Sequence, residues 1–183
     1  MKKLLSCLIF LSFLLLPSFG ICEEARIDDV TVAKAPLKVS FLVRGAFTKD
    51  IEEAIKSGIP TSFNFIIELN KVNSLWPNEQ LGKWEFKHTV KYDSLKEEYE
   101  IIFGEGNEKG IRTKDFGEMK RLMTTASSVA VAPYSPVRMG EEYEFRIKAE
   151  LHTVEMPLLL DYVLFFMKFW DFETGWYSYR FIP

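Results

Sequence analysis

The chain has 183 residues, of which 48% are hydrophobic, 15% aromatic and 27% charged. This length fits one domain, because domains usually hold about 100–200 residues, and the apolar share is large enough for a hydrophobic core. The formal net charge of −3 leaves no basic excess to attract a phosphate backbone, so we expect no nucleic-acid partner.

The N-terminus has the pattern of a secretory signal peptide. Met1-Lys2-Lys3 gives a positive start, an apolar run extends from Leu4 to Leu16, and a Pro-Ser-Phe-Gly segment ends it. Small residues allow cleavage after Gly20 or after Cys22, and the later position is favoured. The apolar run is shorter than the roughly 20 residues that span a bilayer. We therefore expect removal of residues 1–22 and export of the rest to the periplasm or cell envelope, with no transmembrane segment in the mature chain.

Cys22 also permits another interpretation, which is lipidation of a new N-terminal cysteine as in bacterial lipoproteins. The residue before it, Ile21, is larger than the small residue that such processing requires. The remaining cysteine, Cys7, lies within the expected signal peptide. Cleavage after Cys22 leaves no thiol, so we expect no disulfide, no cysteine–metal site and no cysteine nucleophile.

Apolar and polar residues alternate along most of the exported chain, which predicts β-strands with one buried face. The clearest stretch is KWEFKHTVKYD, in which every second residue from Trp84 to Tyr92 lies on one side, and a polar turn over Asp93–Glu98 follows it. In chain order, the expected strands cover Arg26–Ala33, Leu37–Phe47, Thr61–Val72, Lys83–Asp93, Tyr99–Phe103, Val129–Ala132, Glu142–Val154 and Trp176–Ile182.

Three segments are predicted to be helical. Thr48–Gly58 begins with a capping pattern in which Asp50 caps and Glu53 reaches back, and it ends at Gly58. Thr113–Ala126 places its apolar residues on one side. Leu158–Trp170 follows a proline and is apolar on most sides, which is typical of a buried helix.

Strands with one polar and one apolar face, joined by hairpin turns, favour antiparallel pairing. We therefore predict a mainly β fold, an antiparallel two-sheet β-sandwich of roughly seven to nine strands with two or three short inserted helices. Residues 23–183 form a single domain in this prediction. The side chains expected to face the core include Leu37, Val39, Phe41, Val43, Phe63, Phe65, Ile67, Leu69, Tyr143, Phe145, Ile147, Ala149 and Leu151.

The sequence offers few residues for catalysis or metal binding. There are two histidines: His88 falls on the apolar face of its strand, where a core role is favoured, and His152 falls on a polar face. Neither has companions at zinc-ligand spacing, so no metal site is expected. No Gly-x-Ser-x-Gly elbow is present, and the glycine-rich loop Phe103–Arg112 matches no phosphate-binding motif, so no cofactor is expected.

One carboxylate pair has an apolar setting. Asp171 and Glu173 lie between Trp170, Phe172 and Trp176, and such surroundings can raise a carboxyl pKa into the range of acid–base catalysis. The competing interpretation is a simple turn before the last strand.

Three segments resemble a known family. They are GAFTKDIEEAIKSGIPTSFNFIIEL (residues 45–69), HTVKYDSLKEEYEI (88–101) and FWDFETGWYSYRF (169–181). Together they resemble the DUF4390 family of exported bacterial proteins, over roughly Arg26 to Pro183. The resemblance implies a single exported domain, and it supplies no catalytic residues to transfer.

The C-terminal region suggests where a partner would bind. Leu158–Trp170 is too short and too charged for a membrane span, because it contains Asp161 and Lys168. It either closes the core or exposes an aromatic patch, and large exposed apolar patches mark interaction sites. The candidate binding residues are Phe165, Phe169, Trp170 and Trp176.

The favoured function is therefore a non-enzymatic binding or accessory protein of the envelope, with a protein partner or a hydrophobic ligand. Its oligomeric state is left open. One alternative is a periplasmic, hydrolase-like enzyme that acts through His88 or through Asp171 and Glu173. Another is a small outer-membrane β-barrel, which the expected helices and the charged alternate faces disfavour.

Overall fold

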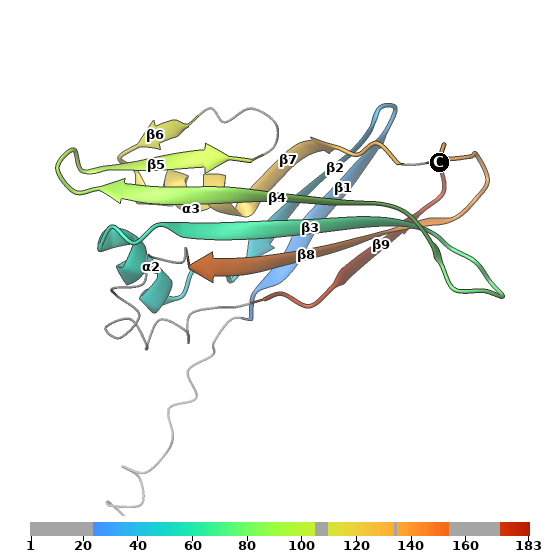
Figure 1. Cartoon of the computed structure of the whole chain (residues 1–183), viewed down its shortest axis with the longest axis horizontal. Coiled ribbons are helices and arrows are strands. Elements are labelled where there is room, and N and C mark those ends of the chain that lie inside the picture. Colours follow the sequence, from blue (N-terminus) through green and yellow to red (C-terminus); the bar gives the residue numbers. More distant parts are fainter. Residues whose placement is uncertain (1–23, 105–109, 134, 154–172) are drawn as a thin grey trace, which may run out of the picture.

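The computed structural model describes residues 24–104, 110–133, 135–153 and 173–183 (Figure 1). Within these ranges, nine strands form two antiparallel sheets, and two helices are inserted between strands along the chain. The predicted mainly β, two-sheet architecture with inserted helices is confirmed. The third expected helix, Leu158–Trp170, lies outside the described residues.

The two sheets differ in size. The smaller one has the order β1-β2-β7, and the larger one has the order β6-β5-β4-β3-β8-β9. In Figure 1, β1 and β2 cross the long strands of the larger sheet obliquely. The strands are β1 (Arg26–Lys34), β2 (Leu37–Arg44), β3 (Thr61–Lys71), β4 (Glu79–Asp93), β5 (Glu98–Phe103), β6 (Ile111–Thr113), β7 (Thr125–Ala130), β8 (Tyr143–Thr153) and β9 (Tyr177–Phe181).

The core lies between the sheets and is built from the inward residues of the period-2 pattern. At its centre the rings of Phe41 on β2 and Phe65 on β3 meet edge to face, with centroids 5.6 Å apart. Phe65 also stacks on Phe86 of β4, at 5.0 Å. Most of the side chains predicted to face the core are buried, whereas Leu37, Trp84 and Tyr92 are half-buried and pack against it.

Helix α2 (Lys49–Lys56) leads from the smaller sheet to β3. Its N-cap is Thr48, whose hydroxyl accepts the Ile51 amide at 3.3 Å. The prediction of Asp50 as the cap is therefore wrong: Asp50 lies in the first helical turn, and Thr48 has the extended backbone that a cap requires. Gly58 has a φ of +83°, as expected for the left-handed exit from the helix.

Helix α3 (Phe116–Thr124) ends two residues before the predicted boundary at Ala126. Thr125 has extended backbone and starts β7 directly, and the hydroxyl of Thr124 turns back to the Lys120 carbonyl at 2.9 Å. Two adjacent β-branched threonines favour this change from helix to strand. Strand β7 therefore lies earlier than the predicted Val129–Ala132.

Candidate functional site

The outward face of the larger sheet carries charges of alternating sign. On β8, Arg146 lies 3.4 Å from Glu68 of β3, and Lys148 lies 3.0 Å from Glu150. This pattern follows from the antiparallel register, which sets Glu68 opposite Arg146. Opposite charges on neighbouring strands stabilise the pairing and leave little uncompensated charge on this face.

Trp176 lies on this charged face, just before β9. The register pairs Tyr177 with Ile147, so Trp176 falls beside Lys148 and points outward. The Arg146 guanidinium lies 4.5 Å from its ring centroid, and Lys148 Nζ lies 6.0 Å from it. This is cation–π geometry. The indole is 39% exposed, so the two cations hold it in place without covering it.

The segment before Trp176 is fixed to β8. Thr174 is buried, its amide donates to the Ala149 carbonyl at 2.9 Å, and its hydroxyl accepts the Ala149 amide at 3.0 Å. Glu173 lies 2.6 Å from Lys148, and its carboxylate, together with that of Glu150, raises the pKa of Lys148. Trp176 is therefore presented by an ordered segment.

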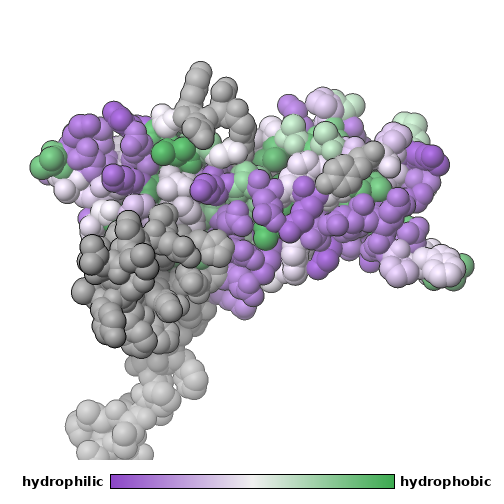
Figure 2. All heavy atoms as spheres, viewed as in Figure 1, coloured by the Kyte–Doolittle hydropathy of each residue, from purple (hydrophilic) through white to green (hydrophobic). Residues whose placement is uncertain are grey.

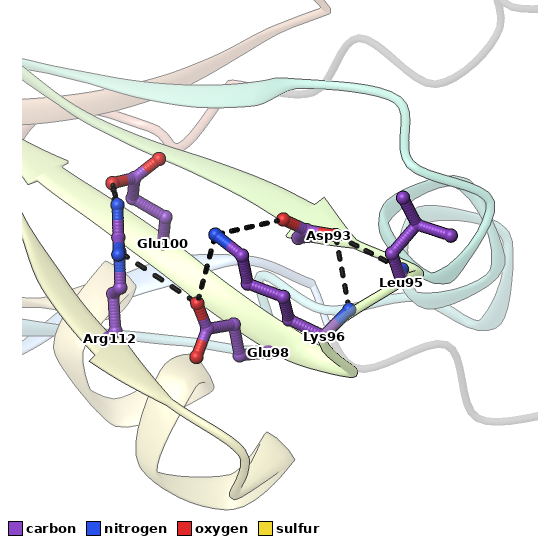
Figure 3. A network of polar contacts seen from close by, with 6 residues as sticks. All are labelled: Asp93, Leu95, Lys96, Glu98, Glu100 and Arg112. Atoms are coloured by element: carbon purple, nitrogen blue, oxygen red, sulfur yellow. Dashed lines mark hydrogen bonds and ion pairs between the residues drawn. The ribbon is translucent and has the colours of Figure 1, made fainter.

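Paired carboxylates elsewhere take part in ion pairs. At the β4–β5 turn, Glu98 lies 4.0 Å from Lys96 and 3.9 Å from Arg112, and Asp93 accepts the amides of Leu95 and Lys96 (Figure 3). The Lys96 amide holds the pKa of Asp93 below its ordinary value. These contacts close an exposed turn, which is a structural role.

Residues 23–180 match the family model of DUF4390, a domain of unknown function. The chain belongs to the DUF4390 family. The resemblance carried by the three sequence segments is thereby confirmed. No curated protein and no solved structure matches this DUF4390 chain.

Most of the sequence-predicted site residues of the DUF4390 chain lie outside the described residues. These are Phe165, Phe169, Trp170 and Asp171, together with Gly20 and Cys22 at the expected cleavage positions. Of the aromatic patch, the structure places Trp176, and of the carboxylate pair it places Glu173. Glu173 is exposed and ion-paired with Lys148.

His88 lies inside the core. It is 1% exposed, and its ring lies 4.9 Å from Phe65 and 4.8 Å from Phe103 between centroids. Its Nδ1 is 3.3 Å from the Met123 carbonyl at the end of α3. An imidazole enclosed in this way joins β4 to α3, and it is not open to a substrate from solvent.

The tip of the β3–β4 hairpin is an exposed apolar feature that was not predicted from the sequence. Leu75 is 90% exposed and Trp76 is 79% exposed. The signal for it was a Leu-Trp pair inside a run of turn-forming residues, Asn-Ser-Leu-Trp-Pro-Asn, where apolar residues have no core to face.

Across residues 24–104, 110–133, 135–153 and 173–183, no cluster of three or more His, Cys, Asp or Glu side chains has the arrangement of a metal site. In the same ranges, no helix has the length and apolar character needed to cross a membrane.

Proposed function

We propose that this DUF4390 protein is an exported, non-enzymatic envelope domain that binds a partner protein through the C-terminal surface around Trp176. The observation that carries the proposal is an exposed indole held over Arg146 on an ordered sheet edge. Tryptophan and arginine are the residue types most enriched among binding hot spots. A residue that is already fixed in place also loses less conformational entropy on binding.

The N-terminal sequence supports the cellular setting of this proposal. A positive start, a short apolar run and small residues before Glu23 are the pattern of a secretory signal. The described site residues favour binding over catalysis, because His88 is enclosed in the core and Glu173 is engaged by Lys148.

Site-specific cross-linking in living cells tests the proposal. A photoreactive amino acid replaces Trp176 in one variant and Leu95, which is 95% exposed on the β4–β5 turn, in a control. We expect a discrete protein adduct from residue 176 and none from residue 95. In the variant with an aromatic photoreactive group at position 176, Arg146→Ser should weaken the adduct, because the aromatic ring of that group then loses the guanidinium that holds it in place.

Fractionation of the same cells tests export. We expect the protein in the envelope or periplasmic fraction, with a new N-terminus at residue 21 or 23. Retention of the full-length chain in the cytoplasm would contradict the export part of the proposal. Equal cross-linking from residues 176 and 95, or an adduct with lipid alone, would contradict the partner part.

A further inference from the structure

The tip of the β3–β4 hairpin, residues 72–78, projects from one end of the molecule, beyond the body of the two sheets (Figures 1 and 2). Its two large apolar side chains, Leu75 and Trp76, are 90% and 79% exposed. Neither takes part in the core. A protruding Leu-Trp pair has no structural role within the described fold, so its exposure calls for a ligand or surface outside it.

The tip carries no charge. Its sequence is Val-Asn-Ser-Leu-Trp-Pro-Asn, and the first charged neighbours are Lys71 and Glu79 at its base. Lys71 is engaged there by Glu141 at 2.7 Å. Charged groups are costly to bring into a bilayer, whereas tryptophan is enriched at the boundary between the headgroups and the hydrocarbon. The composition of the tip suits that boundary.

The tip is also closed by its own hydrogen bonds. The Asn73 amide donates to Asn78 Oδ1 at 3.2 Å, and Asn73 Nδ2 donates to the Pro77 carbonyl at 3.1 Å. At its base, the Val72 amide donates to the Glu142 carbonyl at 2.9 Å, and Pro77 has no amide hydrogen to satisfy. These bonds reduce the cost of moving the backbone into a poorly hydrated medium.

The size of the tip favours a lipid surface over a protein. A stable protein interface buries about 800 Å² per partner, with roughly 20–30 residues on each side. A seven-residue convex tip with two apolar side chains is far smaller. Insertion of a few apolar side chains is, by contrast, how a protein surface binds weakly and reversibly to a bilayer interface, with a strength that follows the apolar area buried.

We propose that the β3–β4 hairpin tip inserts Leu75 and Trp76 into the headgroup–hydrocarbon boundary of a lipid bilayer. Because the tip is uncharged, the binding requires no anionic lipid and resists salt. This contact is separate from the surface around Trp176, which lies on the outward face of the larger sheet.

The test uses the full chain as recovered from producing cells, so that all variants share one N-terminus, with phosphatidylcholine vesicles as the probe. Co-sedimentation gives the partition constant. Replacing both residues, Leu75→Ser with Trp76→Ser, should lower it by on the order of 100-fold, about tenfold for each apolar side chain withdrawn. Leu95→Ser, on the exposed β4–β5 turn, is the matched control and should leave it unchanged.

A second measurement reports on the tip itself. Phosphatidylcholine brominated in its acyl chains quenches a tryptophan that reaches the hydrocarbon boundary. The Trp76→Leu variant should sediment like the unaltered chain but lack the quenched emission. Addition of anionic lipid or of salt should change neither result.

The proposal is overturned if the double variant partitions as the unaltered chain does, or if Trp76→Leu leaves the quenching intact. A requirement for anionic lipid overturns it too. So does a double variant that loses the protein adduct formed from residue 176 but still binds vesicles as the unaltered chain does. Equal unfolding midpoints in urea establish that the variants are folded. Arg146→Ser separates the two proposals, because it should weaken the adduct formed from residue 176 without altering vesicle binding.

Discussion

His88 shows how one polar residue can serve a largely apolar core. Its imidazole packs among aromatic rings, including Phe65 and Phe103, while Nδ1 lies 3.3 Å from the Met123 carbonyl. The ring therefore provides apolar contact in the plane of β4 and a polar contact to the end of α3. An aliphatic residue of similar size provides only the first of these.

Replacing His88 should mainly affect stability. We expect His88→Ala to lower the free energy of unfolding by about 2–4 kcal/mol, because it leaves a cavity among aromatic rings and removes the contact with α3. Lys87→Ala, on the exposed side of the same strand, should change it by less than about 0.5 kcal/mol. Urea unfolding measures both. An unchanged midpoint for His88→Ala would show that the ring does not support the core.

Glu141 joins the start of β8 to β3 and to the loop before β8. Its carboxylate lies 2.7 Å from Lys71 Nζ and accepts the Tyr143 hydroxyl at 2.8 Å. The Tyr143 oxygen in turn accepts the Arg138 amide at 2.8 Å. The hydrogen bond from Lys71, followed by that from Tyr143, holds the pKa of Glu141 below the ordinary value of 4.5.

A lowered carboxyl pKa in the folded state implies stability that is present above the unfolded pKa and lost as the pH falls through the folded one. We therefore expect Glu141→Gln to lower the Tm at neutral pH, and the difference from the unaltered protein to shrink as the pH falls below 4.5. Thermal unfolding monitored by circular dichroism over a pH series measures this. Glu142→Gln is the neighbouring control. A Tm difference that is constant with pH would contradict the assigned role of Glu141.

At the level of elements, the strands were largely predictable from the sequence, and their ends were not. Alternation is a property of each strand by itself, so the inward faces of β3 and β8 are as predicted. Strand β6 was missed because its three residues carry no such pattern. Strand β4 starts early, at Glu79, because Glu79 pairs with Lys71 of β3. This pairing belongs to the tertiary structure and is not visible in the local sequence of β4.

The candidate site was predictable only in part, for the same reason. Aromatic content indicated the C-terminal surface and included Trp176. Its outward orientation depends on the pairing of Tyr177 with Ile147, and its support depends on Arg146, 30 residues earlier in the chain. No local pattern in the sequence fixes a register between strands that are so far apart.

The N-terminus of α2 allows a direct comparison between the cap that the sequence suggested and the one that the structure contains. Thr48→Ala should lower the free energy of unfolding by about 1 kcal/mol, because the Ile51 amide loses its acceptor. Asp50→Ala removes only a favourable charge from the first turn and should cost about 0.3–0.5 kcal/mol. Urea titrations of both variants decide the order. A larger loss from Asp50→Ala would reverse the assignment of the cap.

On the scale of the whole molecule, β3 is the centre of the fold. It pairs with β4 on one side and with β8 on the other along its entire length, and four of its side chains are completely buried. By contrast, β6 pairs over three residues and β9 over five. Amides that open only on global unfolding exchange most slowly. We therefore expect the slowest hydrogen exchange in β3 and faster exchange in β6 and β9.

The contact between Phe41 and Phe65 decides whether the two sheets unfold together. These rings join β2 of the smaller sheet to β3 of the larger one. Phe65→Leu removes part of this contact and should lower the free energy of unfolding by about 1–2 kcal/mol. We expect it to speed hydrogen exchange in β2 and β3 by the same factor. Hydrogen exchange followed by mass spectrometry of peptides from both strands measures it. Faster exchange confined to β3 would mean that the smaller sheet is a separate cooperative unit, because two sheets that share one core must lose their protection together.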